Sequence, residues 1–165
     1  MMLWVNLIMD GPPAMALGLD AEEPDAMHAA PRPADERILT RGRWASVGLS
    51  ALVMAIGTLL VLEFAPGPAL SAGTASIAGT MAFNTFVLFQ FFNILNARHD
   101  TQTVFHRDTL TNRWLWISLG AVILLQVGVT HLGPLQRLFD TTSISLGQWL
   151  VAALVASSVL WIEEI

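Results

Sequence analysis

The chain has 165 residues, of which 54% are hydrophobic and 13% charged, with eight arginines, no lysine, thirteen acidic residues and a formal net charge of −5. A soluble domain usually carries about 25% charged residues, so this composition argues against a soluble globule and excludes a disordered chain. The absence of cysteine excludes disulfide frameworks and thiol nucleophiles, and no basic cluster is dense enough to indicate nucleic-acid binding. The class that remains is a polytopic membrane protein.

Five stretches are long and apolar enough to cross a bilayer, which takes about 20 residues of helix. They are Leu3–Leu19, Trp44–Phe64, Ile77–Ala97, Trp114–Leu132 and Gly147–Ile165. The runs are apolar on all faces rather than striped, which favours membrane spans over the alternative of a soluble helical bundle. We therefore predict an all-α fold, a polytopic membrane helix bundle with five transmembrane helices that occupies residues 1–165.

The arginines predict how this bundle is oriented. Seven of the eight fall in the segments 20–43 and 98–113, and the other is Arg137. If the five spans alternate in direction, both segments lie on one side, and the positive-inside rule makes that side cytoplasmic. The amino terminus is then outside and the carboxyl terminus in the cytoplasm. The arginine-only, alanine-rich composition favours a bacterial plasma membrane.

The first span carries an acid near its middle. Asp10 in that place costs about 2.5–3.5 kcal/mol on insertion scales, and such residues usually face a cavity, a partner or an ion. Asn6 lies four residues earlier and so shares a helical face with Asp10. Gly11, Pro12 and Pro13 follow at once, and prolines remove backbone donors. We expect the helix to be broken at Gly11–Pro13, as in the interrupted helices of transporters.

Two interpretations of this segment remain open from its residues alone. A carboxylate, an amide oxygen and freed carbonyl groups are hard oxygen ligands suited to Ca²⁺, Mn²⁺ or Mg²⁺. Alternatively, Asn6 and Asp10 form a buried hydrogen-bonded pair that holds helices together. If the segment binds calcium, Asp10 and Asn6 supply too few oxygens, because Ca²⁺ takes about 6–8 ligands. Further ligands must then come from elsewhere.

The run Leu3–Gly18, LWVNLIMDGPPAMALG, closely resembles the sixth transmembrane helix of type II P-type ATPases. Within that family it is most similar to the secretory-pathway type of calcium/manganese pump and its bacterial relatives. Later segments follow in the same order: Glu23–Met27 and Pro31–Pro33 resemble the next cytoplasmic loop, Phe91–Asn96 the eighth helix, and Gly133–Phe139 the loop before the tenth. The resemblance therefore implies the carboxyl-terminal transmembrane region, helices six to ten.

This resemblance implies that Asn6 and Asp10 are metal ligands of the transported Ca²⁺ or Mn²⁺. In the family a glutamate and backbone carbonyls of the fourth helix complete the site. Met9 stands where the two-site sarcoplasmic-reticulum type has a threonine ligand, and Gln90 where its eighth helix has a glutamate. Both ligands of the two-site type are therefore replaced, which indicates a single ion. The thioether of Met9 is a poor calcium ligand. Gln90 is interpreted instead as a hydrogen-bonding residue between helices.

The family's phosphorylated motif, Asp-Lys-Thr-Gly-Thr, is absent from the sequence. The resemblance implies that ATP and Mg²⁺ act only in domains preceding this segment, so we assign it no catalytic or cofactor-binding residue and expect no ATPase activity from it alone. Its expected partners are the lipid bilayer and the amino-terminal part of the pump, with helices one to five. Two alternatives stay open: a split-pump subunit that assembles with a separate amino-terminal chain, and a non-enzymatic membrane scaffold. Asn84, Asn93 and Asn96 are interpreted as interhelical hydrogen-bonding residues.

Overall fold

The computed structural model describes residues 2–19, 41–67, 75–96 and 113–163, and every regular element within these ranges is a helix. This confirms the predicted all-α class. Of the predicted polar segments 20–43 and 98–113, residues 20–40 and 98–112 lie outside the described residues. In chain order the elements are α1 (Met2–Trp4), the π-helix η1 (Val5–Asp10), α2 (Gly11–Gly18), α3 (Arg41–Phe64), α4 (Ile77–Asn96), α5 (Arg113–His131), α6 (Gly133–Phe139) and α7 (Leu146–Glu163).

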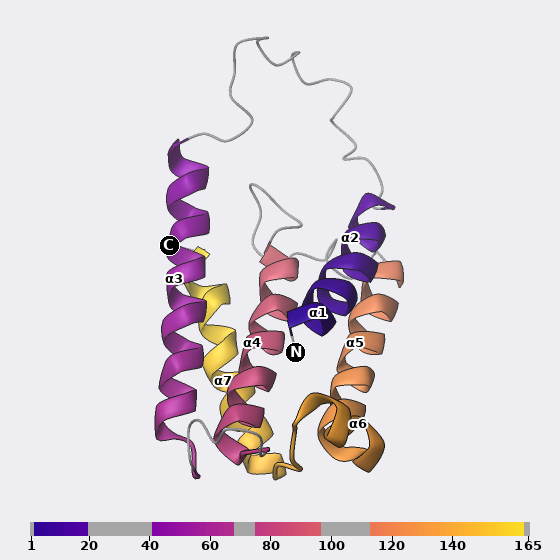
Figure 1. Ribbon diagram of the computed structural model, residues 1–165. Coiled ribbons are helices and arrows are strands. Elements are labelled where there is room, and N and C mark those ends of the chain that lie inside the picture. The colour runs from indigo at the N-terminus through magenta and orange to yellow at the C-terminus, as the bar shows by residue number, and fades with distance from the viewer. Residues whose placement is uncertain (1, 20–40, 68–74, 97–112, 164–165) are drawn as a thin grey trace, which may run out of the picture.

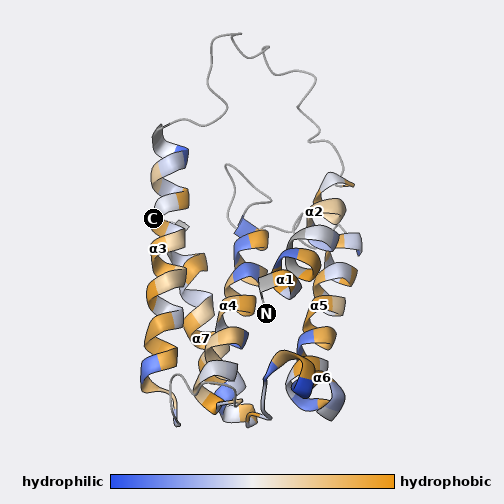
Figure 2. Ribbon diagram, viewed as in Figure 1, coloured by the Kyte–Doolittle hydropathy of each residue, from blue (hydrophilic) through white to orange (hydrophobic). Residues whose placement is uncertain are grey.

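Among the described residues, three helical segments are long and apolar enough to cross a membrane: Gly42–Phe64, Ile77–Asn96 and Arg113–His131. A shorter apolar helix covers Leu146–Trp161. Apolar residues surround these helices instead of forming one stripe (Figure 2). Helical segments thus occupy each of the five predicted stretches, and the molecule is a membrane helix bundle. Within the described residues α3 already includes Arg41, three residues before its predicted span.

α4 is the central helix of the bundle. Within its apolar window 56% of residues are buried, against 22% for α3, which identifies α3 as an outer helix. α3, α4 and α7 pack against one another, while α5 packs against α2 and α6 (Figure 1). η1 also contacts α4. The first predicted span, η1 with α2, therefore contacts two other spans, α4 and α5.

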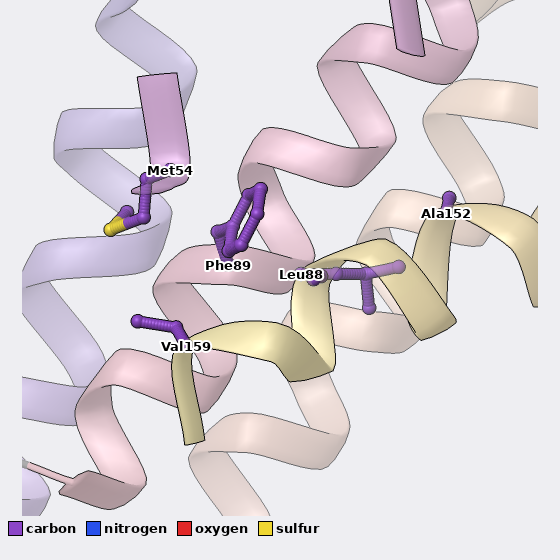
Figure 3. Packing of buried hydrophobic residues seen from close by; sticks show 6 residues of the cluster. Met54, Leu88, Phe89, Ala152 and Val159 are labelled. Atoms are coloured by element: carbon purple, nitrogen blue, oxygen red, sulfur yellow. The ribbon is translucent and has the colours of Figure 1, made fainter. Parts of the chain in front are cut away.

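The largest contact region joins α4 to α3 and α7. Met54 of α3, Phe89 of α4 and Val159 of α7 are buried together there (Figure 3). Gly57 of α3 faces the Phe89 ring, and a Cβ atom added to this glycine would lie 2.6 Å from Cζ of Phe89 and 3.2 Å from Cγ1 of Val155. A small residue at this position is what lets the two helix backbones approach so closely.

The connection between α5 and α7 contains a short helix, α6, although the sequence predicts only a polar segment there. Pro134 lies in the first turn of α6, where a missing N–H costs nothing. Asp140 ends α6 in the left-handed region at φ 51°, a conformation that aspartate and asparagine tolerate. Thr141 is buried and donates its hydroxyl to the Val129 carbonyl at 2.6 Å. Pro134 and Asp140 thus mark the two ends of α6, and the Thr141 hydrogen bond ties the residue after α6 to α5.

Candidate ion site

Both predicted ligands lie on η1, the π-helical segment between α1 and α2. Asn6 is its second residue and Asp10 its last. π-helices are rare, close their hydrogen bonds between residues i and i+5, and occur frequently at functional sites. Four residues span about one turn of such a helix, so the backbone keeps positions 6 and 10 on neighbouring turns.

The helix is not broken at Gly11–Pro13, which corrects the prediction made from the prolines. Gly11 keeps right-handed helical angles (φ −64°, ψ −72°), and α2 runs without interruption from Gly11 to Gly18. The irregular turns lie upstream, over Val5–Asp10. The physical reason is that the wider π turn moves the preceding carbonyl groups away from the proline rings and relieves the clash that would break an α-helix.

The segment has one packed and one uncovered side. Val5 and Ala16 are 8% and 4% exposed, and they pack into clusters with side chains of α4 and α5. Leu3 and Leu7 are 80% and 66% exposed, and Asn6 between them is exposed as well. An amide on the uncovered side of an apolar segment is available to a ligand or to another helix.

The side chains of Met9 and Asp10 lie outside the described part of the structure, so the shared face of Asn6 and Asp10 stays a prediction. The two prolines of this segment add further oxygen atoms that a cation could bind. Pro12 and Pro13 have no N–H, so two carbonyl groups of the preceding turn lack their usual helical donors. Such carbonyls add oxygen atoms of the kind that hard cations bind.

The described residues do not assemble a closed metal cage. Among them, no group of three or more His, Cys, Asp or Glu side chains comes together. The two predicted oxygen ligands, Asn6 and Asp10, both belong to η1, and Asn6 is exposed. Because Ca²⁺ takes about 6–8 oxygen ligands, a site built on this segment requires donors from other helices.

A buried polar cluster joins α4 to α5 beside this segment. Asn84 of α4 and Gln126 and Thr130 of α5 are all fully buried. The Oδ1 atom of Asn84 accepts a hydrogen bond from Nε2 of Gln126 at 2.6 Å. It also lies 3.3 Å from the Thr130 hydroxyl, whose shorter bond, at 2.8 Å, is to the Gln126 carbonyl. This confirms the interhelical bond predicted for Asn84. Asn96 likewise donates to the Val159 carbonyl of α7 at 3.2 Å.

Sequence reasoning identified Asn84 but not the other three members of this cluster, Gln126, Thr130 and Trp4. The indole N–H of Trp4 donates to Oε1 of Gln126 at 3.3 Å, and its ring meets Phe139 edge-on with centroids 4.9 Å apart. The signal for Gln126 was a lone carboxamide inside an apolar span, which usually needs a partner on a neighbouring helix. Nothing in the sequence indicates that this partner is Trp4.

The chain is similar over its whole length to cation-transporting ATPases. The family described as "Cation transporting ATPase, C-terminus" matches residues 1–165. The chain is 36% identical to Calcium-transporting ATPase 1 of Schizosaccharomyces pombe, over 99% of this chain and 18% of that protein. It is 37% identical to Calcium-transporting ATPase type 2C member 2 of Mus musculus (99% and 17%) and 34% identical to type 2C member 1 of Homo sapiens (99% and 17%). The chain thus spans less than a fifth of these relatives' length, and it belongs to the family formed by the carboxyl-terminal region of cation-transporting P-type ATPases.

Proposed function

We propose that this chain is the carboxyl-terminal membrane part of an ATP-driven calcium pump and that it contributes Asn6 and Asp10 to one intramembrane ion site. The observation that carries the proposal is the π-helical segment Val5–Asp10, whose Asn6 lies on the uncovered side of an apolar helix. The relatives that match the chain from end to end are named as calcium-transporting ATPases, which supports calcium as the cargo. Mn²⁺ accepts the same oxygen ligands and is the second proposed cargo.

The proposed site is shared between this segment and helices of the pump that lie outside this chain. Asp10 supplies a charged carboxylate, Asn6 an amide oxygen, and the turn before Pro12 supplies carbonyl groups. The uncovered side, with exposed Leu3 and Leu7, is where we place the helices that supply the remaining ligands. Covering that side would also remove Asn6 from lipid.

Transport requires that the site change its affinity during the cycle. ATP and Mg²⁺ act in the pump's cytoplasmic domains, outside this chain, and phosphorylation there moves other helices against this bundle. Because α4 and α5 hold the packed side of the segment, the motion alters the ligands that meet its uncovered side. The site thereby binds the ion tightly when it is open to the cytoplasm and weakly when it is open to the other side of the membrane. The ion is released from the weakly binding state.

The charge of Asp10 is the sharpest test of this function. In the complete ATPase that carries this chain, Asp10→Asn removes the ligand's charge while keeping its shape. Loss of a buried charged partner typically costs about 3–5 kcal/mol, so we expect apparent ion affinity to fall by at least about a hundredfold. Phosphorylation from ATP, titrated with Ca²⁺ and separately with Mn²⁺, measures this directly.

Asp140→Asn is the matched control, because it makes the same chemical change at an exposed residue after α6. Asparagine tolerates the left-handed backbone angles found there, so this variant should keep the wild-type ion dependence. If Asp10→Asn also kept it for both cations, Asp10 would not be a ligand and the proposed site would be wrong.

A further inference from the structure

The cluster that holds the ion-binding segment is a directed chain of hydrogen bonds. An indole can only donate, so Gln126 must turn its Oε1 atom toward Trp4. Its Nε2 atom is then the one that faces Asn84, and Asn84 must present its Oδ1 atom. The tryptophan therefore determines the orientation of both amide side chains, across three helical segments.

The chain of bonds ends next to the predicted ligands. Trp4 is the residue immediately before η1 and lies two positions before Asn6. Gln126 and Asn84 are fully buried in α5 and α4. Gln126 is buried, so loss of its bond to Trp4 leaves the Oε1 atom without that donor, which costs free energy. The bond, at 3.3 Å and part-buried, therefore restricts where Trp4 lies. The start of the π-helix is thus tied to both spans.

The cluster is not optimised for stability. The Nδ2 atom of Asn84 is buried and has no hydrogen-bond partner among the described residues. Apolar side chains of similar shape would avoid that cost, because replacing both partners of a buried hydrogen bond is often nearly neutral. A polar cluster kept at a cost in this place is better explained by the geometry that it imposes on η1.

We propose that Trp4, Gln126 and Asn84 are positioning residues for the ion site: their hydrogen bonds set where the π-helix begins and so where Asn6 and Asp10 meet the ion. The proposal rests on the proposed function and deepens it. None of the three is proposed as a ligand of the ion. Loss of the bonds therefore weakens ion binding without abolishing phosphorylation.

Trp4→Phe in the complete ATPase tests the first bond by itself. Phenylalanine keeps a ring that can pack edge-on against Phe139 and removes only the N–H donor. We expect the Ca²⁺ concentration for half-maximal phosphorylation to rise about threefold to tenfold, the range set by one hydrogen bond, while the maximal phosphorylation level stays the same. A purely structural residue would lower the maximal level instead.

A triple variant, Trp4→Phe with Gln126→Leu and Asn84→Leu, separates positioning from stability. It removes all three polar side chains together, and the Thr130 hydroxyl keeps its bond to the Gln126 backbone carbonyl at 2.8 Å. We expect it to fold as well as the wild type and to show the same shift as Trp4→Phe alone, because members of one network are not additive. Trp44→Phe, at an exposed tryptophan of α3, is the matched control and should show no shift.

Besides a fall in the maximal level of Trp4→Phe, two results would overturn the inference, and they differ in what else they affect. If the wild type shows calcium-dependent phosphorylation and the triple variant has the same half-maximal concentration, the positioning role is wrong and the proposed function stands. If the wild type shows no ion-dependent phosphorylation at all, the proposed function fails and the positioning role fails with it.

Discussion

Two residues near the proposed ligands bear on how many ions the site holds. Met9 precedes Asp10 on η1 and offers a thioether, which is a poor ligand for calcium. Gln90 lies half-buried on α4 and carries no charge. Each added Ca²⁺ would bring two positive charges into the membrane interior, where burial of charge is costly. With Asp10 the only acid of the segment, a second ion would have little negative charge to balance it.

We therefore expect equilibrium binding of radioactive Ca²⁺ to the complete ATPase to saturate at one ion for each phosphorylation site. Gln90→Ala should leave both the number of ions and the half-maximal concentration unchanged, because we assign this side chain to contacts between helices. Saturation at two ions for each phosphorylation site would contradict the single-ion proposal.

At the scale of elements, the close approach of α3 and α4 depends on one glycine. Gly57 leaves room for the Phe89 ring, which is fully buried between α3 and α7. Gly48 lies on the same helix and is exposed, and a Cβ atom added there would meet nothing within 4 Å. The two glycines have the same helix propensity, so a comparison of them isolates packing from backbone effects.

Gly57→Leu should lower the free energy of unfolding by at least about 1–3 kcal/mol, the usual cost of overpacking, because the new side chain must displace Phe89 or separate the helices. Gly48→Leu should be neutral or slightly stabilising, since leucine is the better helix former. Thermal unfolding of the complete ATPase in detergent compares the two variants. Equal melting temperatures would contradict the described contact between α3 and α4.

At the scale of the whole molecule, the orientation in the membrane is predicted by the arginines. Arg41 and Arg43 lie at the start of α3, whereas its other end, toward Pro66, has no arginine. The positive-inside rule places the Arg41 end in the cytoplasm and the Pro66 end outside. The chain has no cysteine, so a single introduced thiol reports on one position of this chain alone.

Gly42→Cys and Pro66→Cys place a thiol at exposed positions near opposite ends of α3. We expect a membrane-impermeant maleimide added to intact cells or sealed vesicles of outside-out orientation to label the Pro66→Cys variant. The Gly42→Cys variant should be labelled only after permeabilisation. The reverse pattern would show that the predicted topology is inverted.

The sequence by itself determined the membrane class, the helical stretches and the segment proposed to bind the ion. Bilayer thickness and the need to satisfy every backbone polar group require long apolar helices, and these are visible as runs of residues. Asn6 and Asp10 stand out for the related reason that polar groups inside such runs are rare and costly. The interhelical bonds of Asn84 and Asn96 follow from the same argument.

Only the tertiary structure decided where the helix becomes irregular and what holds it. The prolines indicated a break at Gly11–Pro13, yet the chain absorbs their clash in the π turns of Val5–Asp10, which pack against α4. Trp4 and Gln126 are 122 residues apart in the sequence, and their contact depends on which helices are neighbours. Hydropathy cannot encode that choice, because helices that are apolar all round can pack on many faces and only complementary side-chain shapes and hydrogen bonds select among them.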